Sequence, residues 1–461
     1  MPSPASYQVL LRYTVSSEVD ITKDVEALTL EREIATFQEG LKVGRAEVQL
    51  TNDYGRYTPT NSNTPLNLIP GLEVQISGVS SGSGGSQVIF KGTVDETAVF
   101  VGAPSAPPTA TLRLSDATKA LVKQETFSSF YTKSISVVSS ICAELLVNGG
   151  IATTAFSLSI TEQDRRGIVG VERQPIADAL YEFIKTGGYV AYVARNGVLR
   201  MRQRGAIGSG TAVTTYQHFY NYEYGYSDDG VLNKLRLETQ DYEIDPSESS
   251  VFPVSEDEAI AVPSSGFVTL SFDYVDTDRN FVKLYVASVT TMNVKDAETG
   301  AAGNLNSSYV ALLGATTAVF SIFNGEGTQG WLRESIEIRG RETENANKRE
   351  MIFSQASSQA VYGIREHDVE SDVFGGSSMM NIFKDYVFAR YADPSPSVNV
   401  TLRNAYPFIL TADLSNKLAI IHSETGIRMQ MGILAMRESI EAGPDGWKHD
   451  VEYRLRDANK I

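Results

Sequence analysis

The sequence predicts a mainly β protein with α+β modules. Three observations support this prediction: the first 115 residues alternate short strand-like runs with turns, residues 115–204 change to helical spacing followed by a hairpin, and residues 248–345 return to strand-like runs. Short strands between turn signals are typical of barrels and sandwiches, and a helix next to a hairpin is typical of small α+β modules. At 461 residues the chain is longer than one hydrophobic core usually grows, so we expect about two to four domains.

The composition excludes several classes of protein. Every apolar run is shorter than the roughly 18 to 20 residues that cross a bilayer, so no membrane insertion is expected. The first six residues, Met1–Ser6, lack the basic and apolar regions of a secretory signal, which predicts assembly in a cytoplasm. Cys142 is the only cysteine, so one chain cannot form an internal disulfide or a thiolate metal cluster, and its apolar helical surroundings predict a core thiol.

The formal net charge of −16 argues against a protein that binds nucleic acid by neutralising phosphates. It leaves two readings of the excess acidic residues open. In the first, the acidic residues line a channel that repels passing DNA. In the second, they keep a large assembly subunit soluble. The sequence does not show which of these carboxylates face a channel.

The most distinctive turn lies between strand-like runs at 46–50 and 72–76, inside a region that is expected to be a barrel or a sandwich. Asparagine and aspartate bond their own backbone, glycine accepts positive φ, and proline prevents the strand from continuing. The residues that define this turn are Asn52, Asp53, Gly55, Arg56 and Pro59.

Helical spacing begins after this region. Apolar residues between 135 and 146 recur at helical intervals and stop at a Gly-Gly pair. A second helix is predicted at 175–188, with a proline in its first turn and another Gly-Gly pair at its end. A hairpin follows at once, and Asn196 and Gly197 supply the positive φ values of its turn.

Two local patterns admit both a ligand and a plain structural reading. Every second residue of one hairpin strand is an arginine: Arg200, Arg202 and Arg204. These arginines form either an anion-binding face or a solvent-exposed strand face, and we favour the solvent-exposed face. Residues 276–280 resemble the start of a calcium loop. However, a phenylalanine replaces the turn glycine and an alanine replaces the bidentate glutamate, so no metal site is predicted.

The β-rich block at 248–345 is predicted to be a sandwich of about a hundred residues. An acidic, Ser-rich linker is expected at 245–258. Strands are predicted at 267–272, 281–286 and 318–323.

The last hundred residues return to mixed structure. A helix is predicted at 382–391, and Asp393-Pro394 ends it before a strand at 398–402. The chain closes with a hairpin whose turn is 443–446. In its final arm, Trp447 and every second residue after it alternate with charged residues, so one face is buried and the other is wet or at an interface.

No group of residues predicts chemistry. The four histidines, His218, His367, His422 and His449, are not paired at metal-ligand spacing. No nucleophile elbow, zincin helix, phosphate loop or dinucleotide fingerprint is present. We therefore expect no catalytic residue, no cofactor and no enzymatic activity.

Several segments nevertheless occur together in a distinctive order along nearly the whole chain. They are the turn at 52–59, the strand pair at 71–74 and 88–95, the strand and aspartate at 112–116, the hairpin at 187–204, the asparagine segment at 233–237, the run at 336–341, the segment at 358–365 with Tyr362 and Gly363, and the closing hairpin with Trp447. In this order the chain resembles tailed-phage baseplate or tail-tip hub proteins of the siphophage minor-tail type, which are similar to the hubs of contractile baseplates.

The resemblance implies four domains, two of them tube-type antiparallel β-barrels. Residues 1–115 would form the first hub barrel and residues 116–230 a helical and α+β module. Residues 231–245 with 346–461 would form the second hub barrel with its helix, and residues 246–345 an inserted β-sandwich. Three copies of such a chain would alternate their barrels around a pseudo-sixfold ring.

The resemblance also implies a function. It suggests a structural virion protein, expressed late, that joins the tail tube to the tip and surrounds the channel for genome ejection. Its partners would be a distal tail or tail-tube protein, the tape measure protein, and a central spike or receptor-binding protein, while DNA passes without specific binding. A carbohydrate-binding tip or surface protein is the alternative, for which Trp331 is the residue to test. A glycan hydrolase is a third reading.

Overall fold

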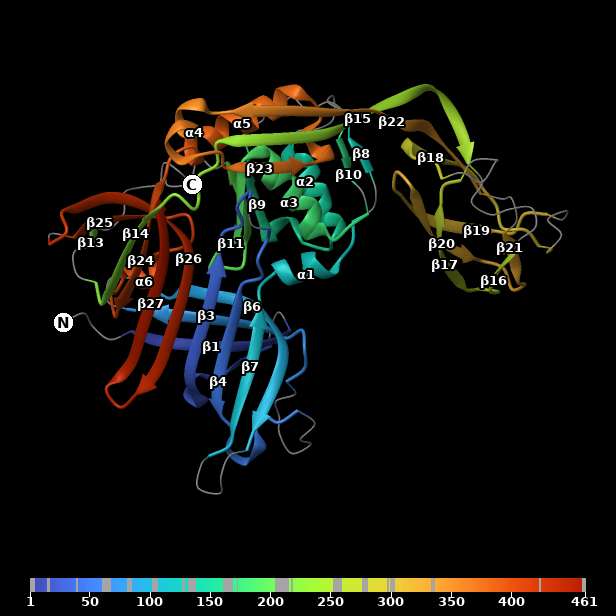
Figure 1. Ribbon diagram of the computed structural model, residues 1–461. Helices are drawn as coiled ribbons and strands as arrows, with labels where there is room; N and C mark the ends of the chain where they lie inside the picture. Colours follow the sequence, from blue (N-terminus) through green and yellow to red (C-terminus); the bar gives the residue numbers. More distant parts are fainter. Residues whose placement is uncertain are drawn as a thin grey trace.

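The structure is a computed structural model. It describes residues 5–14, 17–38, 40–59, 68–80, 85–101, 107–126, 129–131, 138–160, 169–171, 173–203, 215–216, 219–251, 259–275, 281–296, 298, 303–332, 336–422 and 424–457. In these residues the strands form six sheets, the largest with thirteen strands, and the helices are few. The fold is mainly β with α+β modules, as the sequence predicts (Figure 1).

The N-terminal strands curl around one apolar core. They are β1 (Ser6–Thr14), β2 (Ser17–Asp20), β3 (Val25–Glu33), β4 (Arg45–Thr51), β5 (Glu73–Val79), β6 (Gln87–Phe100) and β7 (Thr109–Ser115). Their order in the sheet is β3-β4-β7-β6-β5-β1-β2. Alternate residues of β1 and of β3, such as Val9 and Leu28, lie in the same core although these strands are far apart in that order. The sheet therefore folds over on itself, and β1 crosses the direction of β3 and β4 (Figure 1).

The second region is an α+β module. Its elements are α1 (Thr118–Lys123), β8 (Ser129–Tyr131), α2 (Val138–Asn148), β9 (Phe156–Ser159), β10 (Val169–Val171), α3 (Ile176–Gly187), β11 (Tyr189–Val193) and β12 (Leu199–Gln203). Both predicted helices are present, and Gly188 ends α3 with a φ of 64°. The predicted hairpin is β11–β12, and β9 joins it in parallel, which the sequence did not predict. Cys142 is buried in the core of this module, as expected.

The C-terminal strands enclose a third core. They are β13 (Thr215–Tyr216), β14 (Asn221–Ser227), β24 (Ser395–Arg403), β25 (Lys417–His422), β26 (Ile427–Gly443) and β27 (Gly446–Asp457), with a short helix α6 (Phe408–Thr411). In the final arm, Val451, Tyr453 and Leu455 are buried while Glu452 and Arg454 are exposed. This pattern confirms the predicted alternation.

The N-terminal and C-terminal strands form one continuous sheet. β26 pairs antiparallel with β3, from Ala435 opposite Glu33 to Glu441 opposite Ala27. The path through the sheet is β14-β24-β27-β26-β3-β4-β7-β6-β5-β1-β2. The sequence did not predict this seam, because pairing across about 400 residues leaves no local signal.

A two-stranded arm leads away from this body. Its strands are β15 (Lys234–Val251) and β22 (Ile336–Ser354), with β23 (Glu366–Glu370) beside β15 and helices α4 (Ala356–Tyr362) and α5 (Ser377–Tyr391) next to them (Figure 1). The linker predicted at 245–258 is wrong up to Val251, because β15 continues through this segment and residues 248–251 pair with β22. Pairing satisfies the backbone of a strand whatever its side chains are. Residues 252–258 lie outside the described part of the chain.

The insert lies at the far end of the arm (Figure 1). It contains β16 (Ile260–Val262), β17 (Phe267–Asp273), β18 (Leu284–Met292), β19 (Ser307–Leu313), β20 (Thr317–Asn324) and β21 (Gly330–Leu332) around its own core. The predicted strands at 267–272 and 318–323 are β17 and β20, while β18 starts three residues later than predicted. The calcium-like residues 276–280 lie outside the described residues.

Strand pairing groups some segments differently from the predicted division at residue 230. β14 pairs with β24 of the C-terminal strands, whereas β15 pairs with β22 and β23. The four-domain division stays a proposal.

Among the described helices, none is both long enough and apolar enough to cross a membrane.

Candidate functional site

The predicted turn is held together by a buried asparagine. Asn52 is buried, and its Oδ1 accepts a hydrogen bond from the backbone N–H of Tyr57 at 2.7 Å. Its Nδ2 donates to the Thr58 hydroxyl at 3.1 Å. Tyr54 and Gly55 have positive φ values of 57° and 69°, as a tight turn requires. The side chain of one residue therefore fixes the shape of the whole turn.

The same turn is anchored on a neighbouring loop. Arg56 Nη1 donates to Asp24 Oδ2 at 2.9 Å, and the Tyr57 hydroxyl donates to the same oxygen. The Tyr57 ring is buried in the first core. Asp53 is exposed and Pro59 is half-buried. The geometry gives this motif a structural role, because its polar groups bond one another and Asp24 of the same N-terminal region.

Two other predicted segments meet each other. Asn233 Nδ2 donates to the Gly363 carbonyl oxygen, and the Arg365 backbone N–H donates to Asn233 Oδ1, both at 2.8 Å. Asn233 is fully buried, Tyr362 is half-buried, and Gly363 ends α4 with a φ of 72°. The asparagine at the start of β15 therefore fixes the loop that follows α4.

The closing hairpin reaches the first core. Trp447 lies edge-on to the Tyr7 ring, with centroids 5.5 Å apart. The Tyr7 hydroxyl lies 2.6 Å from His449 Nδ1. These contacts join the last strand of the chain to the first.

The hairpin turn at Asn196 and Gly197 also has a structural role. Asn196 Oδ1 accepts from the Val198 N–H at 3.2 Å, and Gly197 has a φ of 82°. The prediction of a positive φ at Asn196 is wrong, because only Gly197 of this pair adopts one. The residue before them, Arg195, is buried and points into a cluster of charged groups that the sequence did not predict. Arg200 and Arg202 are half-buried, and Arg204 lies outside the described residues.

The centre of this cluster is the carboxylate of Glu438 on β26. Arg195 Nη2 lies 3.0 Å from Glu438 Oε1, and Arg32 Nη2 lies 3.7 Å from the same oxygen. His449 Nε2 lies 3.0 Å from Glu438 Oε2. All four side chains are buried.

A second carboxylate completes the cluster. Asp413 Oδ1 accepts from Arg32 Nη1 at 2.9 Å, and Asp413 Oδ2 accepts from the Arg195 backbone N–H at 3.1 Å. Arg195 Nη2 also donates to the Ile409 carbonyl at 2.8 Å. The cluster thus joins β3 of the N-terminal strands, the turn of the β11–β12 hairpin and the C-terminal strands. We call it the buried junction.

The charges in the buried junction stabilise one another. Burial alone would raise the pKa of Glu438, but the Arg195 charge, the His449 hydrogen bond and Arg32 outweigh it and lower that pKa to about 2. Burial, reinforced by Tyr406, raises the pKa of Tyr7. Glu438 is therefore ionised and Tyr7 protonated at neutral pH.

The chain of Tyr7, His449 and Glu438 resembles a proton relay, but its surroundings do not suit catalysis. His449 and Glu438 have no exposed surface, so a substrate cannot reach the imidazole. Sequence reasoning missed the cluster because it tested histidines for metal-ligand spacing. The available signal was a histidine on the buried face of an otherwise apolar strand.

The other described histidines have structural surroundings. His367 lies edge-on to Phe37, and burial lowers its pKa. His422 stacks on Tyr222 with centroids 4.9 Å apart. His218 lies outside the described part of the chain. Within the described ranges, no three His, Cys, Asp or Glu side chains are grouped to hold a metal ion.

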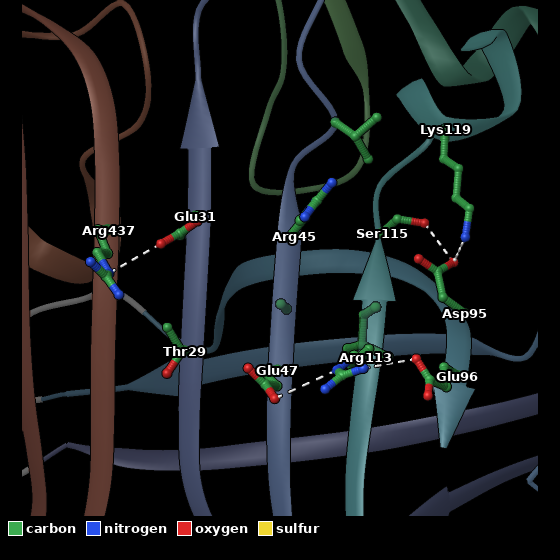
Figure 2. Close-up of a pocket in the computed structure, with 13 residues that line it drawn as sticks. Thr29, Glu31, Arg45, Glu47, Asp95, Glu96, Arg113, Ser115, Lys119 and Arg437 are labelled. Carbon is green, nitrogen blue, oxygen red and sulfur yellow. Dashed lines mark hydrogen bonds and ion pairs between the residues drawn. The ribbon is translucent and has the colours of Figure 1, made fainter. Parts of the chain in front are cut away.

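A second feature is the charged outer face of the continuous sheet (Figure 2). Across neighbouring strands, Arg437 lies 3.1 Å from Glu31, and Arg113 lies 2.9 Å from Glu96 and 3.8 Å from Glu47. At the edge of this face, Lys119 lies 2.5 Å from Asp95. Charges of opposite sign are therefore paired across the strands.

Comparison with solved structures gives a consistent result. The structure is similar to a tail protein from Neisseria meningitidis MC58, with a TM-score of 0.55, 10% sequence identity and 99% of each chain covered. It is similar to the prophage MuSo2 43 kDa tail protein from Shewanella oneidensis, with a TM-score of 0.50, 9% identity and 99% of each chain covered. The chain has the fold of these tail proteins.

The tail-protein fold confirms the predicted resemblance at the level of structure. No protein-family model matches the sequence, and a comparison with curated proteins finds no match.

Asp116 is buried, and among the described residues no cationic side chain forms an ion pair with its carboxyl group. Asp116 Oδ2 accepts from the Gly44 N–H and Oδ1 from the Thr118 N–H, both at 3.0 Å. Burial outweighs these hydrogen bonds and raises the pKa of Asp116 from 3.8 to about 6. A side chain at residue 44 would place its Cβ 2.4 Å from Asp116 Oδ2, so glycine is needed there.

We predict that Glu438→Gln strongly destabilises the protein. The substitution leaves Arg195 and Arg32 buried with less negative charge beside them, which costs about 3–5 kcal/mol. Urea unfolding followed by circular dichroism measures the loss. Glu441→Gln, an exposed position on the same strand, is the matched control and is expected to unfold like wild type. Equal midpoints for both variants would contradict a stabilising junction.

We also predict a pH dependence from Asp116. Because its pKa is raised on folding, its contribution to stability is present below pH 3.8 and is lost as pH rises through about 6. The loss amounts to about 3 kcal/mol. Unfolding free energies of wild type and Asp116→Asn are compared between pH 4 and pH 7, and their difference is expected to change across this range. A constant difference would show that the carboxyl titrates normally.

Proposed function

We propose that the chain is a structural, non-enzymatic virion protein, the hub of a phage tail tip or baseplate. As a homotrimer it joins the tail tube to the tip and surrounds the channel for genome ejection. The observation that carries this proposal is the tail-protein fold over 99% of the chain, combined with one sheet that runs through both sets of barrel strands. Two joined barrels per chain suit a threefold ring of six barrels.

The edges of the sheet support a ring of copies. β14 pairs with β24 alone among the described strands, so its other edge is unpaired. Within the N-terminal strands, β6 pairs with β5 only up to Thr93, and among the described strands Glu96–Phe100 pair with β7 alone. Unpaired edges favour association with another strand. A β14 edge that meets the β6 edge of the next copy makes a head-to-tail contact, and such a contact closes into a ring of three when each copy is rotated by a third of a turn from the last.

The side chains at the β14 edge suit an interface with another chain. Tyr224 lies opposite the core residue Val398, yet Tyr224 and Tyr226 are 41% and 63% exposed. Tyrosine is enriched at protein interfaces because its ring is apolar and its hydroxyl tolerates water. A neighbouring copy would cover both rings.

The remaining roles follow from the hub proposal. The partners would be a distal tail or tail-tube protein, the tape measure protein, and a central spike or receptor-binding protein. DNA would pass without specific binding, and the virion would acquire the hub in the host cytoplasm. In this proposal residues 1–115 form the first hub barrel and the insert projects outward.

We predict a trimer in solution. Light scattering is expected to give three times the chain mass of 50.3 kDa, and negative-stain images of the same fraction are expected to show rings. The pair Tyr224→Glu and Tyr226→Glu should reduce the mass to that of one chain, because charge at the edge opposes burial. Tyr54→Glu, at a fully exposed loop position, should leave the trimer intact. A monomer at every concentration would contradict self-assembly.

A carbohydrate-binding insert is the second candidate function. Trp331 is half-buried, so it is a less suitable ligand platform than the outer face of β17, β20 and β19. There Phe267, Val310 and Phe323 are exposed at 73%, 73% and 45%. Aromatic faces without charge suit neutral sugars. A glycan-dependent rise in melting temperature that Phe267→Ala abolishes would favour this candidate, and the absence of any rise would argue against it.

A further inference from the structure

The outer face of the continuous sheet carries charges in an ordered array. In the row that crosses the middle of the sheet, the register places Glu452 beside Arg437, Arg437 beside Glu31, and Glu31 beside Arg45. The sign of the charge alternates at each step. The row runs from the C-terminal strands across the seam into the N-terminal strands.

Neighbouring rows have the same character. In the next row Glu47 lies opposite Arg113, and Arg113 lies opposite Glu96. On the other side Arg454 forms an ion pair with Glu33. We call these side chains the compensated face, and its members are Glu31, Glu33, Glu47, Glu96, Glu452, Arg45, Arg113, Arg437 and Arg454.

The compensated face is close to neutral although the chain has a net charge of −16. Arg437 and Glu31 are 64% and 54% exposed, and Arg113 and Glu96 are 55% and 57% exposed. Ion pairs this exposed contribute little to stability. The array therefore matters mainly for the electrostatic potential that it presents to solvent.

That potential determines how the face meets a polyanion. Proteins bind duplex DNA tightly when their lysine and arginine side chains neutralise phosphates and release counterions. On the compensated face Arg437, Arg113 and Arg454 already lie beside carboxylates. A DNA phosphate near these arginines therefore gains little electrostatic attraction and is repelled by the neighbouring carboxylates. A strongly acidic wall would instead repel DNA over the distance that salt allows.

We propose that the compensated face is the surface past which double-stranded DNA moves, and that its paired carboxylates prevent the arginines from holding phosphates. This inference rests on the proposed channel. In place of a uniformly acidic channel surface, the proposal gives a surface on which attraction and repulsion of phosphate are balanced residue by residue.

The test removes the compensation without removing an arginine. Glu31→Gln, Glu47→Gln and Glu96→Gln are combined in one variant, which removes the carboxylates that form ion pairs with Arg437 and Arg113 and raises the net charge by three. The matched control combines Glu350→Gln, Glu366→Gln and Glu370→Gln. These carboxylates pair with Arg236, Lys234 and Lys348 on the exposed ladder of β15, β22 and β23.

Fluorescence anisotropy with a labelled duplex of about 30 base pairs, at about 50 mM salt, measures binding. Wild type is expected not to bind, and the variant of the compensated face to bind at least tenfold more tightly than the control, with affinity that falls as salt rises. Equal binding by variant and control would overturn the proposal, since net charge alone would explain it. Tight binding by wild type, removed by Arg113→Ala and Arg437→Ala, would also overturn it.

Light scattering on the same samples separates this inference from the proposed ring. If wild type is trimeric but the variant gains no affinity for DNA, the inference fails while the hub proposal stands. If all samples are monomeric and the variant still gains specific affinity, the face is compensated as proposed and the ring is wrong.

Discussion

The structure depends on the charge of Glu438. A carboxylate without exposed surface is tolerated only where cations and hydrogen-bond donors surround it. Here Arg32 comes from β3, Arg195 from the turn of a hairpin, and His449 from the last strand. No two of these segments are neighbours in the chain except the arms of the final hairpin. The positions of the N-terminal strands, the C-terminal strands and the α+β module are therefore linked through one ionised group.

The buried junction lies beside the seam between β3 and β26, and the two features support each other. Backbone pairing from Ala435 to Glu441 sets the register of the two strands. Glu438 and Arg32 lie within that stretch, so a slip of either strand by one residue would turn its own charged side chain to the solvent face. The ion pairs thus select one register, while the backbone supplies the continuous surface on which the charged rows align.

Much of the local structure could be predicted from the sequence. Alternation identified the arm that contains Val451 to Leu455, and the Gly-Gly pairs marked the ends of α2 and α3. The turn at Asn52 was predicted from residue chemistry alone. Its partner Asp24, the parallel strand β9, the edge strand β14 and the buried junction were missed. Each depends on pairing between distant segments, and the residues involved carry no periodic or motif-based signal of the segment that they meet.

The arm formed by β15 and β22 has a consequence for how such a protein can diversify. The two strands begin side by side, with Lys234 opposite Ser354, and they carry the insert at their far end. The insert has its own core, separate from those of the body. Because β15 and β22 are not part of the thirteen-stranded sheet, a different module can be attached at these two strands while that sheet stays unchanged. The geometry of the sheet does not depend on which module the two strands carry.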